Sequence, residues 1–144
     1  MTAITSVSAY TVRQISALTT GQVASMTTAA VAEMTARQVQ ALNNTNLAAL
    51  DTSQVQALSA DQINAMRASQ VSALTSSQLN ALTTTQLSTM RAGQVASFSN
   101  IGSVSNTQLQ NFTTSEIQAL TTLQIMGLID AQLGALGTDQ IQSL

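Results

Sequence analysis

The sequence predicts an all-α solenoid built from very short helices, with one helix for each eight-residue repeat. Three observations lead to this fold class. The pattern Thr-x-x-Gln-aliphatic-x-small-Leu/Met returns every eight residues, as in TSSQLNAL and TTTQLSTM at residues 75–90. Each repeat carries the signature of a helix start. A period of eight fits neither one continuous helix nor a strand, so each repeat must be a structural unit of its own.

The repeat covers nearly the whole chain. With the recurrent Gln at position 4, octads begin at residues 3, 11, 19, 27, 35, 43, 51, 59, 67, 75, 83 and 91, and then at 105, 113, 121, 129 and 137. Residues 99–104, SNIGSV, interrupt this series but keep an aliphatic pair three apart, Ile101 and Val104. We interpret this hexad as one shortened unit that shifts the superhelix. The expected organisation is a single octapeptide-repeat solenoid over residues 1–144, a segment of a longer array.

The apolar positions of the octad are 5 and 8. Position 5 is Val, Ile or Leu in every octad, and position 8 is Leu, Met, Tyr or Phe. Position 7 is mostly Ala, whereas position 6 varies as an exposed site does. We therefore expect positions 5, 7 and 8 to face a common interior, with the small residue at position 7 allowing close approach of helices.

No continuous secondary structure keeps this pattern on one face. A helix turns about 100° per residue, so an octad drifts by about 80° beyond two full turns. In a strand, positions 5 and 8 would point to opposite faces. The runs of Thr and Ser are also poor helix interiors.

The octad instead matches a capping box with a hydrophobic staple. In Leu74-Thr75-x-x-Gln78-Leu79, Thr75 is the N-cap, Gln78 reaches back to the N-cap amide, and the two Leu side chains pack together. Because an N-cap has non-helical backbone angles, each box starts one helix and ends the previous one. The N-cap type departs from this pattern at Ala3, Arg67, Arg91, Ile129 and Gly137, and the Gln is replaced at Ser6, Ala30, Asn46 and Glu116.

An isolated octad cannot be stable, because about 12 residues are needed for a marginal helix in water. Stability must come from stacking of successive octads. Two periods remain open for the superhelical turn. The segment QVQAL recurs after 16 residues, at 38 and 54, whereas Arg67 and Arg91 are 24 residues apart. Two or three octads per turn both agree with the sequence.

The composition disfavours most chemistry. The chain has no His and no Cys, so the commonest general base and metal ligands are missing. The carboxylates are scattered over different octad positions, which indicates solvated or capping roles: Glu33, Asp51, Asp61, Glu116, Asp130 and Asp139. We expect no enzyme activity and no catalytic, cofactor-binding or metal-binding residues.

The charge and the hydropathy pattern also limit the partners. Only 7 % of the residues are charged and the net charge is -2, which gives no basic surface for nucleic acid. The chain has no run of 18 apolar residues, and its first residues lack the regions of a signal peptide. We expect no nucleic-acid partner and no membrane insertion.

The consensus Leu-Thr-x-x-Gln-Val-x-Ala-Leu resembles the LTxxQVxAL octapeptide arrays of very long secreted or surface proteins of bacteria, which are adhesin-like. The resemblance covers nearly the whole chain and implies a stalk or spacer at an extracellular or cell-surface location. Two alternatives remain. Ranks of Thr such as Thr83-Thr84-Thr85 could order water in an ice-binding protein. The open ends of a solenoid could also support self-association into filaments.

Overall fold

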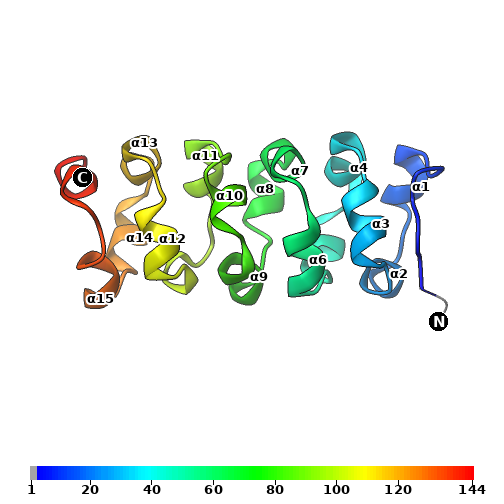
Figure 1. Cartoon of the computed structure of the whole chain (residues 1–144), viewed down its shortest axis with the longest axis horizontal. Coiled ribbons are helices and arrows are strands. Elements are labelled where there is room, and N and C mark those ends of the chain that lie inside the picture. The colour runs from blue at the N-terminus through cyan, green and yellow to red at the C-terminus, as the bar shows by residue number, and fades with distance from the viewer. Residues whose placement is uncertain (1–2) are drawn as a thin grey trace.

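The computed structural model describes residues 3–144 as a rod of short stacked helices (Figure 1). Each α-helix has four to six residues, and only an isolated bridge has strand character in the described part of the chain. The prediction of an all-α solenoid is confirmed. The elements are α1 (Val12–Ser16), α2 (Thr20–Ala24), α3 (Thr28–Glu33), α4 (Ala36–Ala41), α5 (Asn44–Ala48), α6 (Thr52–Ala57), α7 (Ala60–Ala65), α8 (Ala68–Val71), α9 (Ser76–Ala81), α10 (Thr84–Leu87), α11 (Ala92–Val95), the 3-10 helix η1 (Ile101–Ser103), α12 (Asn106–Gln110), α13 (Thr114–Gln118), α14 (Thr122–Met126), α15 (Asp130–Leu133) and α16 (Thr138–Gln142).

The helices begin at the predicted N-cap residues. Thr75 has extended backbone angles, φ -71 and ψ 162, and its hydroxyl oxygen accepts from the Gln78 amide at 3.3 Å. The Gln78 Oε1 atom accepts in return from the Thr75 amide at 2.8 Å, which closes the capping box. The same helix ends at Leu82, whose backbone is again extended, so the next N-cap follows at once.

Four helices begin without a capping side chain. Their N-cap residues are Arg67, Arg91, Ile129 and Gly137, and none of these makes a side-chain cap bond. The Gln at position 4 still accepts from the N-cap amide in each case, at 3.0 Å between Arg67 N and Gln70 Oε1. The glutamine half of the box is therefore sufficient to place the helix start.

The first octad does not form a helix, so the expectation of one helix in every octad is wrong there. Ile4 forms a parallel bridge with Met26, and its carbonyl accepts from the Thr27 amide at 2.9 Å. Two octad positions explain the difference. Ala3 has no capping oxygen, and the short Ser6 side chain donates to Glu33 Oε2 at 2.7 Å instead of returning to an N-cap.

Each helix stacks on the third helix before it. α4 packs against α1 and α7, and α6 packs against α3 and α9. Figure 1 shows α1, α4 and α7 along one edge of the rod. This arrangement excludes the two-octad turn that the sequence left open.

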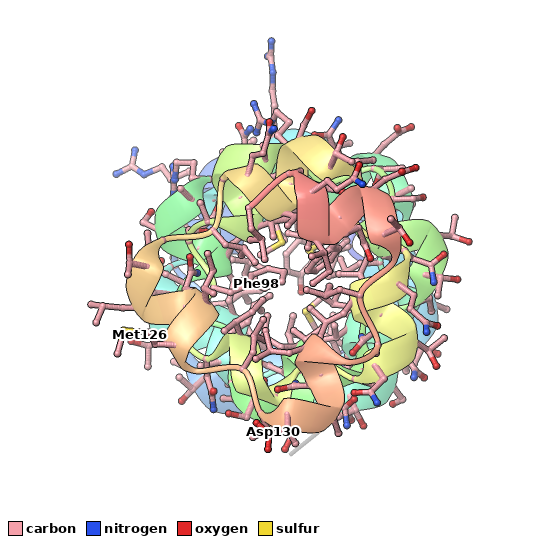
Figure 2. All side chains as sticks on the ribbon, turned by 90° about the vertical axis from the view of Figure 1, so that its left-hand side faces the viewer. Phe98, Met126 and Asp130 are labelled. Atoms are coloured by element: carbon pink, nitrogen blue, oxygen red, sulfur yellow. The ribbon has the colours of Figure 1, made fainter. Side chains whose placement is uncertain are left out.

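The core runs along the axis of the rod. Leu79 and Leu82, at positions 5 and 8, are 0 % and 3 % exposed. In the view along the rod (Figure 2), Phe98 points toward the axis, whereas Met126 and Asp130 point outward. Position 7 is only half-buried, as at Ala81, and position 4 is buried in its place. The expectation for position 7 is therefore wrong, because positions 4, 5 and 8 share one face of so short a helix.

The hexad is a shortened unit, as predicted. Its aliphatic residues Ile101 and Val104 are 3 % and 1 % exposed, and η1 takes the place of an α-helix. The Phe98 and Phe112 rings, on either side of the hexad in sequence, lie 6.2 Å apart between centroids. Gly102 allows a close approach, because a Cβ atom there would lie 3.0 Å from the Gly127 carbonyl oxygen.

Candidate functional site

The acidic residues do not form a chemical site. Within residues 3–144, no three His, Cys, Asp or Glu residues lie close enough together to hold a metal ion. Asp51 is the N-cap of α6, and Glu33 binds the first octad through the Ser6 hydroxyl and the Val7 amide. The other four lie in first turns of helices, where the helix dipole favours negative charge: Asp61, Glu116, Asp130 and Asp139.

Two of these carboxylates have a pKa below the ordinary value. The Ser6 hydroxyl donates to Glu33 Oε2, and together with the Val7 amide it lowers the pKa of Glu33. The Ser53 hydroxyl, 2.6 Å from Asp51 Oδ1, and the Gln54 amide lower the pKa of Asp51. In both cases hydrogen bonds favour the ionised form. The bonds hold chain segments in place.

The described helices offer no route across a bilayer, since none is both long and apolar enough to span one. The polar side chains that organise the molecule are instead the buried glutamines. Eleven of them connect one turn of the rod to the turn before it, and we call this set the glutamine ladder. Its members are Gln38, Gln54, Gln62, Gln70, Gln78, Gln86, Gln94, Gln108, Gln124, Gln132 and Gln140.

Each ladder glutamine uses both ends of its amide. Gln78 Oε1 accepts from the Thr75 amide at the start of α9. Gln78 Nε2 donates to the main-chain carbonyls of Leu47 and Leu50, at 2.8 and 2.7 Å. These carbonyls lie at the end of the α5 octad, where helices leave acceptors without intrahelical partners. One side chain thus caps the start of one helix and the end of another.

The ladder has a fixed register. Before the hexad, the Nε2 atom of each ladder glutamine reaches the position-8 carbonyl 28 residues earlier, as from Gln70 to Leu42 at 2.9 Å. Twenty-eight residues are three and a half octads, so the donor meets a bend between two helices of the preceding turn. Across the hexad the separation falls to 26 residues, from Gln108 to Leu82, and it returns to 28 from Gln132 to Val104. The hexad therefore shifts the superhelix by the two residues that it lacks.

Three replacements of the ladder glutamine separate its two functions. Asn46 still donates to the Leu18 carbonyl at 2.7 Å, but its shorter side chain does not close the box of α5. Glu116 keeps the box, at 2.6 Å from the Thr113 amide, but a carboxylate has no N–H to donate. Ala30 can do neither, and the Ile4 carbonyl accepts from the Thr27 amide in its place.

The sequence interpretation assigned these glutamines to capping alone and missed the connection between turns. A signal was present. Gln70, Gln94, Gln132 and Gln140 persist in the four octads whose N-cap residue cannot form its half of the box. A glutamine kept without its capping partner indicates a second role.

Comparison with known proteins supports the repeat assignment for part of the chain. Residues 31–68 and 44–76 match the ALTTAQ repeat family. No curated protein and no solved structure shows significant similarity to the chain. The matched residues lie between α3 and α9, where the structure repeats most regularly. The match identifies a structural repeat and no catalytic domain, so the protein is a repeat-containing helical scaffold of the ALTTAQ type in this region.

Proposed function

We propose that the protein is a non-enzymatic stalk or spacer of a large bacterial surface or secreted adhesin-like protein. The observation that carries this proposal is the continuity of the glutamine ladder. Its rungs run from Gln38 to Gln140, and only the substituted positions and the hexad interrupt the series. The rod in Figure 1 is accordingly extended along one axis with a constant architecture.

A spacer must resist bending, and the rod has features that supply stiffness. Neighbouring turns share a continuous apolar core in addition to the rungs. Among residues 3–144 no residue has a positive φ, and the chain contains no proline. Successive helices are separated by a few residues whose amides and carbonyls are bonded to ladder side chains. A bend between two turns would have to break rungs and expose core side chains.

The outer surface suits a passive connector outside the cell. Most exposed positions carry Thr, Ser, Gln or Ala, and charged residues are few. Such a surface has little electrostatic attraction for other macromolecules. The rungs also bind the turns together without disulfides, in a chain that has no Cys. These features support an extracellular or cell-surface location, which protease treatment of intact cells that carry the parent protein would test.

The spacer role predicts that length follows repeat number. We would compare the chain with a variant in which residues 43–74 are duplicated and one in which they are deleted. Small-angle X-ray scattering should show a maximum dimension that rises and falls with the number of octads, at a constant cross-section. Rounded particles of similar dimension in all three variants would contradict a spacer.

A further inference from the structure

We infer that this chain assembles head to tail, with the first turn of one copy stacked on the last turn of a second copy. The contact would extend the glutamine ladder from one molecule to the next. It goes beyond a spacer role, because a spacer requires no contact between its ends. The donors, the acceptors and the apolar surfaces at the two ends carry this conclusion.

The first turn presents two unused donors. The Oε1 atoms of Gln14 and Gln22 accept from the Thr11 and Thr19 amides at 2.8 and 2.9 Å, as in the rest of the ladder. Both glutamines are exposed, and within residues 3–144 no acceptor lies in reach of their Nε2 atoms. In contrast, Gln38 in the second turn donates to the Tyr10 carbonyl at 2.7 Å. Gln14 and Gln22 are therefore preorganised rungs without a partner.

The last turn presents the matching acceptors. The Phe112 carbonyl, at position 8, accepts from Gln140 Nε2 at 2.7 Å. Leu128 and Leu136 occupy position 8 of later octads, and in the described chain no side chain donates to their carbonyls. A further turn would bring two ladder glutamines to these two carbonyls. The copy that supplies it offers Gln14 and Gln22 in successive octads.

The last turn also exposes apolar side chains that are buried elsewhere. Leu79 and Ile117, at position 5 in the interior of the rod, are 0 % exposed. Ile141 occupies the same position in the last octad and is 47 % exposed, and Ile125 and Leu133 are only partly buried. A stacked turn would remove this surface from water, which is the main favourable term in protein association.

The charges at the two ends are opposite in sign. The octads of Gln14 and Gln22 contain Arg13 and no acidic residue, whereas the last two octads contain Asp130 and Asp139 and no basic residue. The contact joins two different surfaces, so each addition leaves a free end of each kind. The product is an open series of linear oligomers, and a closed dimer does not form.

A second apolar surface lies on the side of the rod and provides the competing explanation for association. Leu123, Met126 and Ile129 are 81 %, 76 % and 62 % exposed. Figure 2 shows Met126 pointing away from the rod axis. Contact through these residues would join rods side by side. It would not involve Gln14 or Gln22.

Sedimentation velocity of the 144-residue chain, from micromolar to millimolar concentration, tests the head-to-tail contact. The average mass should rise continuously beyond that of a dimer. The double variant Gln14→Glu, Gln22→Glu keeps both capping boxes, as Glu116 does, but removes both donors. We expect its association to be weaker by roughly 100-fold, about tenfold for each lost rung.

Two further variants separate the explanations. The matched charge control Gln56→Glu, Gln118→Glu changes exposed position-6 residues of α6 and α13 and should associate like the unmodified chain. The variant Leu123→Ser, Met126→Ser removes the side patch and should also associate normally. A chain that stays monomeric, a mass that saturates at a dimer, or an association lost with the side patch but kept without Gln14 and Gln22 would overturn the head-to-tail contact. A rod-shaped monomer would still leave the spacer role intact.

Discussion

Replacement of Gln78 by Glu isolates the contribution of one rung to stability. The Glu side chain can still accept from the Thr75 amide, as Glu116 accepts from Thr113 at 2.6 Å. The change therefore leaves the capping box of α9 intact. It removes the Nε2 donor from the Leu47 and Leu50 carbonyls and brings a carboxylate oxygen toward them.

The expected loss follows from the partners of these carbonyls. The Leu47 carbonyl also accepts from the Leu50 amide at 3.2 Å, so it keeps one bond. The Leu50 carbonyl loses its ladder donor, and an unsatisfied buried acceptor costs about 1–3 kcal/mol. Gln78 is only 2 % exposed, so the new charge adds a desolvation cost of similar size. We expect the free energy of unfolding to fall by ~3 kcal/mol, which lowers the melting temperature by about 10 °C for a chain of this length.

Urea and thermal unfolding followed by circular dichroism would measure this loss. Gln14→Glu is the matched control at low protein concentration, because its capping partner is also a Thr and its Nε2 atom has no acceptor in the described chain. We expect that variant to change stability by less than ~0.5 kcal/mol. Equal losses for Gln78→Glu and Gln14→Glu would show that the rungs contribute nothing beyond capping, and the reasoning would be refuted.

The remaining predictions concern Glu116, the acid-sensitive carboxylates and the hexad. Glu116→Gln should raise stability by ~1 kcal/mol in urea unfolding, because it restores an N–H donor toward the preceding turn; an unchanged midpoint would contradict a general role of the rungs. The lowered pKa values of Glu33 and Asp51 mean that their stabilisation is present above the unfolded-state pKa values and is lost as the pH falls through the folded-state values. Urea midpoints should therefore fall on acidification, and less so in Asp51→Asn, which keeps an N-cap acceptor as Asn43 does; an identical acid response would argue against the Asp51 contribution. Gly102→Ala should lose about 1–3 kcal/mol, since the new Cβ atom would meet the Gly127 carbonyl oxygen at 3.0 Å. Gly93→Ala meets nothing within 4 Å and should be neutral or stabilising by up to ~1 kcal/mol, so an equal loss in both would exclude the close approach as the cause.

The local part of this fold could be predicted from the sequence. A capping box is a signal within six residues, and Leu74 to Leu79 contains all of it. The helix starts at Thr75 and at Ser105 follow from that signal, and so does the burial of positions 5 and 8. The hexad was recognisable because Ile101 and Val104 keep the spacing of the apolar pair.

The connections between turns could not be derived in the same way. The register of the ladder depends on the angle between successive helices, which the octad pattern does not specify. Nothing local in Gln78 points to Leu50, which lies 28 residues away. The pairing of Ile4 with the octad of Ala30 is also a contact between distant segments, where one exception compensates for another. The burial of position 4 was missed for this reason, since a glutamine is expected to be exposed unless its partners are known.

The fixed register of the ladder has a consequence for how such a gene can change. Each rung depends only on the separation between its donor and its acceptor, so the loss or gain of whole octads leaves every remaining rung with an equivalent partner. Recombination between the nearly identical coding units would therefore yield rods of different lengths that still fold. A deletion of another size would displace all rungs that span it, and the hexad is an example in which the separation adjusted from 28 to 26 residues.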